Sequence, residues 1–360
     1  MTFEGHAAGT NADRGTVTGG SLIVIGGLGQ GSFADVVKVR NLETDKVYAM
    51  KVIAKKIVVS QKARERLSME LCAMTKMPRS PFLQRCYGAF ESATNIFFVV
   101  DLNSGGDLFF HLSSRFSEKH GWHLSENEGR VILAELALAI EHMHENGYLH
   151  KDIKVENVML DRSGHVKLVD FGLAEIMQAE VMYLEPTGSI VYMAPELLRY
   201  HTCGRHTDWW AYGILANELL TGCVPWSNFE DDRVIQNEIQ SLVFRFPGHL
   251  SQPATQLLGG LLERDYKTRL GTISGREVRA AQFFRGIDWE ATAQLKCAPA
   301  FVPSERSASS DAMLRAIASY VARSEVPGPG EFTWYHGLGR IATHPRYRAE
   351  TSTLPYLGRP

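Results

Sequence analysis

Cysteine is scarce in this sequence, and none of the spacings that cysteine chemistry favours is present. The five cysteines lie far apart, without a C-x-x-C pair or a ligand-like cluster: Cys72, Cys86, Cys203, Cys223 and Cys297. Such a distribution excludes a zinc ribbon and a disulfide framework. We therefore expect buried thiols in a reducing compartment.

Long apolar runs and an excess of one charge are also missing. No run of 18 apolar residues occurs, so no membrane span is predicted, and residues 1–20 lack the charged-then-apolar order of a signal peptide. The 38 Lys and Arg residues nearly balance 40 Asp and Glu, and a net charge of −2 gives no electrostatic case for binding nucleic acid. We expect a soluble cytoplasmic protein, with the nucleus as a second location.

The residue pattern changes character along the chain. Residues 1–20, rich in Gly, Thr and Ala, predict a disordered leader. Three β-rich runs follow from residue 21, then a helical stretch at 60–77 and two more strand candidates. After residue 103 the pattern is mostly helical, and its longest helix begins with Ser125 and Glu128 in a capping-box arrangement. A Pro/Ser/Gly-punctuated tail with one helix at 309–324 follows about residue 290.

The first chemical signal is a glycine-rich segment. Gly29 and Gly31 are followed by Ala34, where a third glycine would complete the pattern G-x-G-x-x-G. A dinucleotide-binding turn would open a helix, but the β-branched residues at 36–39 predict a strand. A hairpin whose backbone N–H groups approach a phosphate is therefore favoured, and an ordinary glycine hairpin is the alternative.

A lysine on an apolar strand is the second signal. Lys51 lies within VYAMKVI, where an unpaired ammonium group would be costly to bury. Its anion could be Glu70 on the predicted helix or the phosphate of a nucleotide. A purely structural ion pair is the alternative.

The third signal is a short polar loop between apolar segments. The stretch HKDIKVENVML at 150–160 places Asp152, Lys154 and Asn157 close together. A solvated turn could have this composition, but it also suits phosphoryl transfer. Two further motifs follow at 170–172 (DFG) and 194–196 (APE).

These motifs, in this order and spacing, resemble those of a eukaryotic protein kinase of the serine/threonine type. The resemblance implies an α+β fold of two lobes, a small antiparallel β-sheet N-lobe with one main helix and a larger, mostly helical C-lobe. It places a kinase domain at 21–290, divided into an N-lobe at 21–103 and a C-lobe at 104–290, and an AGC-like C-terminal tail at 291–360.

The resemblance also implies a role for each polar residue of the loop. Asp152 would orient the substrate hydroxyl and accept its proton, and Lys154 would neutralise charge on the γ-phosphate. Asn157 and Asp170 would hold Mg²⁺ ions. These roles suit a loose transition state, which is catalysed mainly by positioning and charge neutralisation.

ATP is expected to lie against the sheet of the N-lobe. Lys51, fixed by Glu70, would contact the α- and β-phosphates, and the chain from Asp101 would hydrogen-bond the adenine. The residues implied to surround the nucleotide are Leu28, Gly29, Gly31, Val36, Ala49, Lys51, Val100, Asp101, Asp107 and Met159.

Three segments resemble the AGC group of kinases in particular: RSPFL at 79–83, DWW at 208–210 and FFRGIDWEA at 283–291. Members that prefer Arg upstream of the acceptor carry acidic groups, which predicts protein substrates with basic residues upstream. The matching acids here are Asp107, Glu156 and Glu218. Two structural links are implied as well, from Asp208 to the catalytic loop and from Arg269 to Glu196.

Two departures from the family pattern invite hypotheses. Lys151 replaces the usual Arg before Asp152, and Glu185 stands where a phosphorylated Thr is usual. We hypothesise a fixed Lys151–Glu185 ion pair that gives constitutive activity, with Thr187 and Tyr183 as alternative regulatory sites. In the tail, the cluster FTWY at 332–335 could dock on the helix that carries Glu70 or be unrelated to that groove.

An active, monomeric serine/threonine protein kinase is the favoured function. The five polar residues on which the kinase motifs depend are all present: Lys51, Glu70, Asp152, Asn157 and Asp170. A pseudokinase scaffold that binds ATP without efficient turnover is the alternative, supported by Ala34, Lys151 and the unusual tail. A small-molecule kinase is disfavoured by the APE and DWW motifs.

Overall fold

The computed structural model describes residues 22–30, 34–114, 123–227, 229, 231–241, 243–303 and 333–334. The predicted leader at 1–20 and the predicted tail helix at 309–324 lie outside these residues. The chain forms two compact units. The first contains the described residues up to Lys55, Cys86–Asp101 and the strand at 333–334; the second contains Lys56–Arg85 and the described residues from Leu102 to residue 303.

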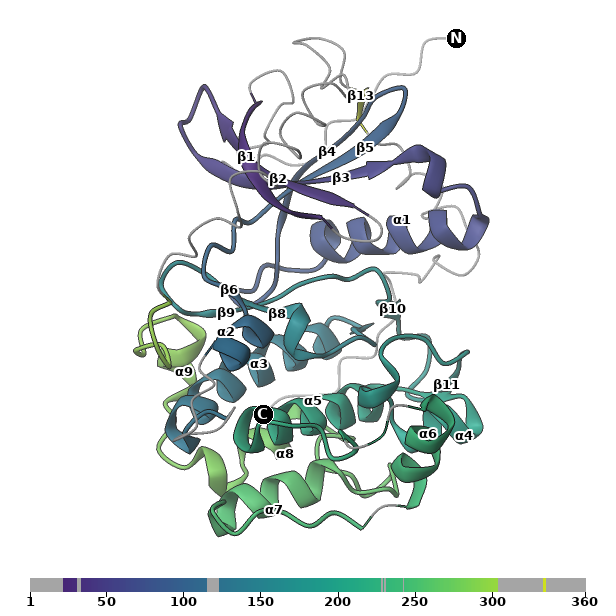
Figure 1. Ribbon diagram of the computed structural model, residues 1–360, viewed down its shortest axis with the longest axis vertical. Helices are drawn as coiled ribbons and strands as arrows, with labels where there is room; N and C mark the ends of the chain where they lie inside the picture. Colours follow the sequence, from purple (N-terminus) through teal and green to yellow (C-terminus); the bar gives the residue numbers. More distant parts are fainter. Residues whose placement is uncertain are drawn as a thin grey trace, which may run out of the picture. The chain divides into compact units, whose positions relative to one another are not determined.

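The first unit is built on one antiparallel sheet with the strand order β1-β2-β3-β5-β4-β13 (Figure 1). A short polar turn joins β2 to β3, and in it the Asn41 side chain accepts from the backbone N–H groups of Glu43 and Thr44. The strands are β1 (Leu22–Gln30), β2 (Asp35–Asn41), β3 (Val47–Ala54), β4 (Cys86–Glu91), β5 (Asn95–Val100) and β13 (Thr333–Trp334).

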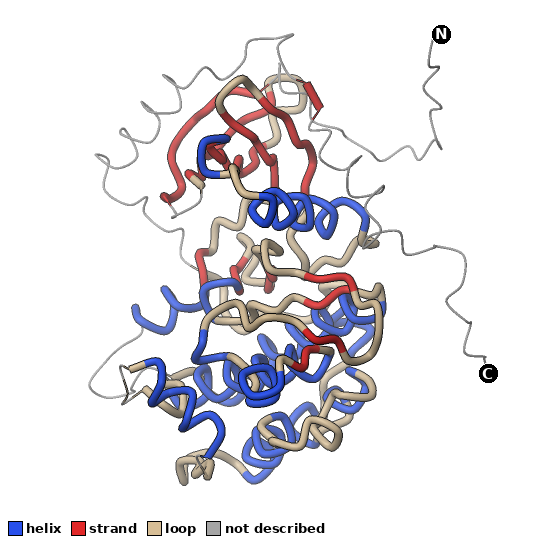
Figure 2. The backbone as a smooth tube through the Cα atoms, turned by 90° about the vertical axis from the view of Figure 1, so that its right-hand side faces the viewer, coloured by secondary structure: helices blue, strands red, loops and turns tan. Residues whose placement is uncertain are grey.

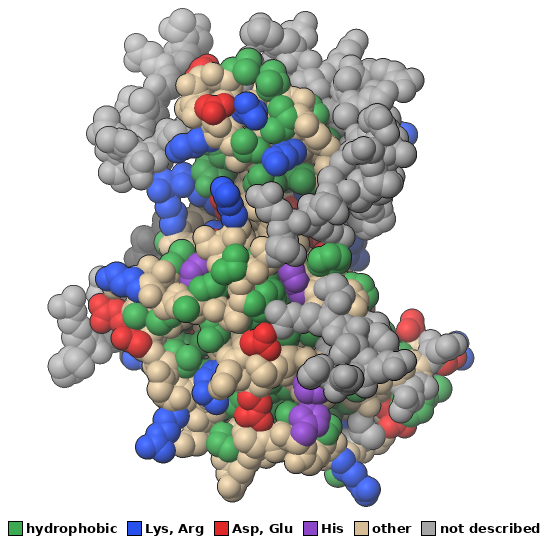
Figure 3. All heavy atoms as spheres, turned by 60° about the vertical axis from the view of Figure 1, so that its left-hand side comes forward, with side chains coloured by type: hydrophobic (Ala, Val, Ile, Leu, Met, Phe, Trp, Pro, Cys, Tyr) green, Lys and Arg blue, Asp and Glu red, His purple; other side chains and the backbone are tan. Residues whose placement is uncertain are grey.

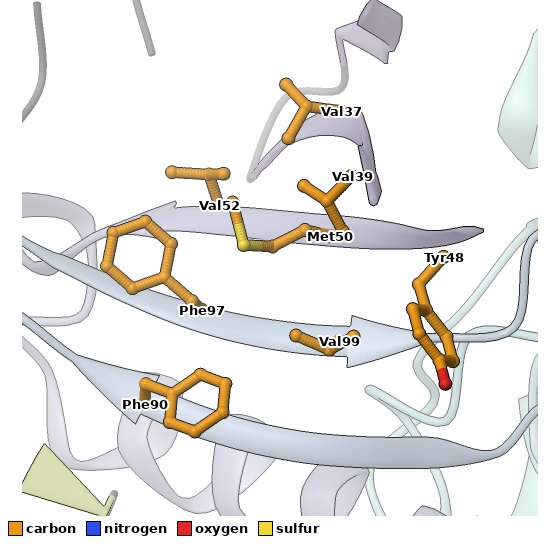
Figure 4. Packing of buried hydrophobic residues seen from close by; sticks show 8 residues of the cluster. All are labelled: Val37, Val39, Tyr48, Met50, Val52, Phe90, Phe97 and Val99. Atoms are coloured by element: carbon orange, nitrogen blue, oxygen red, sulfur yellow. The ribbon is translucent and has the colours of Figure 1, made fainter. Parts of the chain in front are cut away.

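One face of this sheet forms a buried apolar cluster (Figure 4). Because side chains alternate between faces along a strand, every second residue of β2, β3 and β5 contributes to it. Its members are Val37, Val39, Tyr48, Met50, Val52, Phe90, Phe97 and Val99. The intervening residues lie on the opposite face, where Val36 is directly paired with Lys51 and Ala49 with Val100. The period of two thus brings together four of the residues predicted to surround a nucleotide.

The second unit is mostly helical (Figure 2). Its helices are α1 (Gln61–Lys76), α2 (Leu108–Ser114), α3 (Glu126–Glu145), α4 (Pro195–Tyr200), α5 (Arg205–Thr221), α6 (Asp232–Ser241), α7 (Gln252–Leu261), α8 (Gly275–Arg279) and α9 (Trp289–Ala293). Short 3-10 helices include η3 (Val155–Asn157) and η4 (Ile190–Tyr192).

Three small antiparallel sheets connect the loops of this unit. β6 (Gly106–Asp107), β8 (Val158–Leu160) and β9 (Val166–Leu168) form one of them. The other two pair β7 (Tyr148–Leu149) with β10 (Glu175–Ile176), and β11 (Met182–Tyr183) with β12 (Thr202–Cys203). They fix the segments on either side of the polar loop at 150–157.

Local sequence explains why the central helices begin and end where they do. The predicted capping box of α3 is confirmed, with Ser125 and Glu128 each bonding the other's backbone N–H. Helix α5 ends at Gly222, whose φ of +85° suits a residue without a Cβ. Along α5, Trp209, Trp210 and most of their neighbours are buried, so this helix lies inside the core of the unit.

The observed folds agree with the predicted α+β class, an antiparallel sheet followed by a largely helical region. Within the part of the chain that the structure describes, none of the helices combines the length and apolar character needed to cross a bilayer. On the face drawn in Figure 3, basic (blue) and acidic (red) side chains both occur, in keeping with the small net charge.

Candidate active site

Asp208 fastens the polar loop to the core helix α5. Its side chain is 1% exposed; Oδ2 accepts from the backbone N–H of His150 at 2.9 Å, and Oδ1 from that of Lys151 at 2.9 Å. His144 Nε2 donates to Oδ2 at 2.8 Å. Burial alone would raise the pKa of Asp208, but these donors outweigh it and hold the pKa below its usual value. The predicted link from Asp208 to the loop is confirmed.

Lys154 and Asn157 each lie within hydrogen-bonding distance of Asp152 in the polar loop. Lys154 Nζ is 2.8 Å from Asp152 Oδ2. Asn157 Nδ2 donates to the Asp152 carbonyl at 2.8 Å and to Asp152 Oδ2 at 2.9 Å. The Asp152 carboxylate is therefore oriented by the amide of Asn157 and the ammonium group of Lys154.

Ser189, on the segment before the APE motif, completes this group. Its Oγ accepts from Lys154 Nζ at 3.0 Å, and its backbone N–H donates to Asp152 Oδ1 at 3.3 Å. Gly188 makes the approach possible, since its φ is +110° and a Cβ would stand 3.0 Å from the Lys151 carbonyl oxygen. Both oxygens of Asp152 are thus oriented by donors.

His150 connects the polar loop to the DFG segment. Asp152 N–H donates to His150 Nδ1 at 3.3 Å, so Nδ1 is an acceptor and Nε2 carries the proton that is donated to the Val169 carbonyl at 3.1 Å. Burial lowers the pKa of His150, more than the neighbouring carboxylates raise it. A neutral imidazole therefore positions Asp152 and the residue before Asp170.

Asp170 is held in a conformation that few residues adopt. Its φ is +65°, in the left-handed region, and its side chain is exposed. Gly172 N–H donates to Asp170 Oδ1 at 3.3 Å. Glu70, buried on α1, lies beside this turn, because a Cβ on Gly172 would stand 3.9 Å from Glu70 Oε2.

The donor set of the loop suits Mg²⁺. Asn157 uses its amide nitrogen on Asp152, which leaves its oxygen to ligate, and Asp170 presents a carboxylate to solvent. Among the described residues, no group of three or more His, Cys, Asp or Glu side chains is arranged to hold a metal ion. Magnesium is commonly bound through one or two protein oxygens together with substrate phosphates, so these two residues fit it.

Most residues predicted to surround the nucleotide belong to the first unit. Leu28 and Gly29 lie on β1, Val36 on β2, Ala49 and Lys51 on β3, and Val100 and Asp101 at the end of β5. Gly31 lies outside the described residues. In the second unit Asp107 is paired with Met159 between β6 and β8, and its Oδ1 caps α2 by accepting from Phe110 N–H at 2.7 Å. The predicted Lys51–Glu70 pair joins residues of different units and stays a prediction.

A tyrosine that sequence reasoning missed holds one of the acids predicted to recognise basic substrates. Tyr192, on η4, donates its hydroxyl to Glu218 Oε2. Burial and the acid Glu156 raise the pKa of Glu218, and the hydrogen bond opposes them. The only available signal was an aromatic residue two positions before the APE motif.

The hypothesised Lys151–Glu185 ion pair is wrong. Lys151 Nζ lies 4.0 Å from Glu175 Oε2, and Glu185 Oε1 lies 3.5 Å from His201 Nδ1. The reason is backbone pairing: β11 pairs with β12, and Leu184 N–H donates to the His201 carbonyl at 2.8 Å, which brings the next residue beside His201. Lys151 and Glu185 both line a cavity of about 220 Å³ without pairing across it.

The stretch from the DFG to the APE motif is called the activation segment below. Its C-terminal end is held by a buried ion pair. Arg269 donates through both terminal nitrogens to Glu196, at 2.5 and 2.8 Å. A bidentate, fully buried pair of this kind is strong and directional. The predicted link between these residues is confirmed.

Known proteins with similar sequences show the family to which this chain belongs. The family model for the protein kinase domain matches residues 22–284. The serine/threonine-protein kinase SCH9 of Saccharomyces cerevisiae is 38% identical over 285 residues, which cover 77% of this chain and 33% of that protein. The RAC-beta serine/threonine-protein kinase of Homo sapiens is 34% identical over 283 residues, covering 78% of this chain and 57% of that protein.

A probable serine/threonine-protein kinase of Dictyostelium discoideum is 35% identical over 280 residues, covering 78% of this chain and 60% of that protein. The chain thus spans between a third and three fifths of the length of these relatives. The similarity to RAC-type kinases bears out the predicted likeness to the AGC group. The chain belongs to the protein kinase family, among relatives named as serine/threonine kinases.

Proposed function

We propose that this chain is an ATP-dependent serine/threonine protein kinase, with its kinase domain at 21–290. The observation that supports this function is the hydrogen-bonded group of Asp152, Lys154, Asn157 and Ser189. It provides one oriented carboxylate and one ammonium group at a single point, which is what transfer of a phosphoryl group to a hydroxyl requires.

The roles of these side chains follow from their chemistry. Asp152 orients the attacking hydroxyl and accepts its proton, and Lys154 neutralises charge on the transferred group. Asn157 and Asp170 would hold magnesium, which would neutralise phosphate charge. We expect Lys51, with Glu70 as its predicted partner, to bind the α- and β-phosphates of ATP against the face of the sheet that carries Val36, Ala49 and Val100.

Substrate selection is expected to favour basic residues upstream of the acceptor. Glu156 and Glu218 supply acidic groups in the second unit, where burial, and to a smaller extent the charge of Glu156, raises the pKa of Glu218. Asp107 is the third predicted acid. Carboxylates attract guanidinium groups, so we expect Arg upstream of the Ser or Thr.

The C-terminal tail is proposed to dock on the sheet of the N-lobe. Thr333 pairs with Glu91 and Trp334 with Phe90, which adds a strand to the edge of β4. Deleting residues 326–360 should therefore lower both the melting temperature and the rate. Unchanged values for both would contradict the docking.

We expect the protein to act as a cytoplasmic monomer, or in the nucleus.

A pseudokinase scaffold is the competing function, and it differs from a kinase in one measurable step, the transfer of the γ-phosphate to a peptide. The protein is incubated with Mg·ATP labelled on the γ-phosphate and three otherwise identical Arg-containing peptides with Ser, Thr or Tyr as the acceptor. We expect label in the Ser and Thr peptides and little in the Tyr peptide. Binding of ATP, measured by calorimetry, without label in any peptide would support the scaffold instead.

A further inference from the structure

Glu218 is held in a protected position near the end of α5. Tyr192, which is buried, donates its hydroxyl to Glu218 Oε2, and η4, which carries Tyr192, packs on α5. Trp226 Nε1 donates to the Val191 carbonyl at 3.0 Å, a second contact that holds η4. The carboxylate of Glu218 is therefore presented in a fixed place and orientation.

No cation compensates this carboxylate within the described residues. Its titratable neighbours are Tyr192 from η4 and Glu156 from η3, and neither Lys, Arg nor His of the described chain forms an ion pair with Glu218 or Glu156. Burial raises the pKa of Glu218, the bond from Tyr192 lowers it, and Glu156 raises it, to about 7. Two carboxylates without a cation favour either a proton or a basic ligand.

We propose that a guanidinium group of the substrate and a proton compete for Glu218, so that selection of basic substrates is strong at slightly alkaline pH and fades in mild acid. The proposal rests on the protein kinase activity proposed above and adds a regulated specificity to it. When a basic peptide binds below neutral pH, Glu218 releases its proton to solvent and forms the ion pair with the arginine.

The expected size follows from the titration of one group. Arginine stays charged throughout this range, so only the protein titrates. With a Glu218 pKa of about 7, the ionised fraction falls about tenfold between pH 8 and pH 6, and the advantage of a basic peptide should fall by up to the same factor.

Tyr192 and Glu156 act on this equilibrium in opposite directions. Replacing Tyr192 by Phe removes a donor that favours the ionised form, so the midpoint of the transition should move to higher pH. Replacing Glu156 by Gln removes a like charge, so the midpoint should move to lower pH. A purely structural role of either residue would not produce shifts of opposite sign.

The experiment compares two peptides that differ only in Arg or Ala upstream of the acceptor Ser. The ratio of their kcat/KM values is measured from pH 5.8 to 8.5 at constant ionic strength, so that the titration of the catalytic groups cancels. Binding of both peptides is measured by fluorescence anisotropy over the same range. Tyr192→Phe, Glu156→Gln and Glu218→Gln are compared with Glu43→Gln, a charge-matched change at an exposed turn.

We expect a ratio that falls up to tenfold in acid, midpoints displaced in opposite directions by the first two variants, and a low, pH-independent ratio for Glu218→Gln. A ratio and a binding preference that do not change with pH would overturn the proposal, as would midpoints that move together. Binding that depends on pH without any phosphate transfer would contradict the kinase activity and leave the proton competition standing.

Discussion

The catalytic loop and the activation segment belong to the same compact unit but are fastened in different ways. The loop at 150–157 is attached through buried groups, chiefly Asp208 with its three donors. The middle of the activation segment depends on the two-residue pairing of β11 with β12 and on the Glu185–His201 pair, whose side chains are 80% and 48% exposed.

Because of this difference, the geometry of the loop is set by buried contacts, whereas the contacts of the activation segment depend on salt and pH. Hydrogen bonds to a buried charge contribute about 1.5–3 kcal/mol each, whereas an exposed ion pair contributes about 0–1 kcal/mol and is screened by salt. The geometry around Asp152 should therefore persist across conditions. The surroundings of Glu185 should respond to salt, pH and substitution.

Removing the buried attachment should give the largest effect. Asp208→Ala leaves two backbone N–H groups and His144 without their acceptor, so we expect the free energy of unfolding to fall by about 3–5 kcal/mol. Urea unfolding measures this loss. Asp232→Asn, an exposed change on α6, is the control and should have almost no effect; an equal loss in both variants would contradict the role of Asp208.

A smaller effect is expected at the junction of the two regions. Gly188→Ala places a Cβ 3.0 Å from the Lys151 carbonyl at a φ of +110°, which should cost about 1–3 kcal/mol and displace Ser189 from Asp152. We expect both the melting temperature and kcat to decrease. Gly248→Ala, where a Cβ meets open space, should change neither quantity.

The pH dependence of stability gives the next effect in size. The pKa of Glu218 is raised from 4.5 to about 7, so its contribution to stability is complete below pH 4.5 and is lost as the pH rises through 7. Glu218→Gln should be more stable than the wild type by about 1 kcal/mol at pH 8, after allowance for solvent screening. Unfolding curves of the two proteins should converge near pH 5; a constant difference would contradict the raised pKa.

Breaking the exposed Glu185–His201 pair should give the smallest change in the free energy of unfolding. Glu185→Gln removes the pair with His201, and the free energy of unfolding should fall by less than about 0.5 kcal/mol. The difference should vanish in 1 M salt, where exposed charges are screened. A loss as large as that of Asp208→Ala would show that the two regions are fastened alike.

The same contrast explains what the sequence could predict. The motifs name residue types that the chemistry requires, so Asp152, Lys154 and Asn157 could be identified and grouped without coordinates. The link from Asp208 to the loop could be expected for the same reason. These residues lie close together in one short loop or in a buried contact, so each of them has one possible partner.

Contacts between segments that are distant in the sequence could not be derived in this way. The partner of Glu185 depends on the register of the two-residue strands β11 and β12, which no local pattern specifies. The bond from Tyr192 to Glu218 joins residues 26 positions apart and depends on how η4 packs on α5. In both cases the sequence names charged or polar residues, but their pairing is decided by tertiary structure.

The most direct test of the central claim is the rate of phosphate transfer by Asp152→Asn. The variant keeps the shape of the side chain and loses its capacity to accept the substrate proton. With Mg·ATP and an Arg-containing Ser peptide, we expect kcat to fall by about 10²–10⁴-fold, with ATP binding retained and Asp232→Asn fully active. A rate within a factor of two of the wild type would contradict the assignment of the catalytic loop.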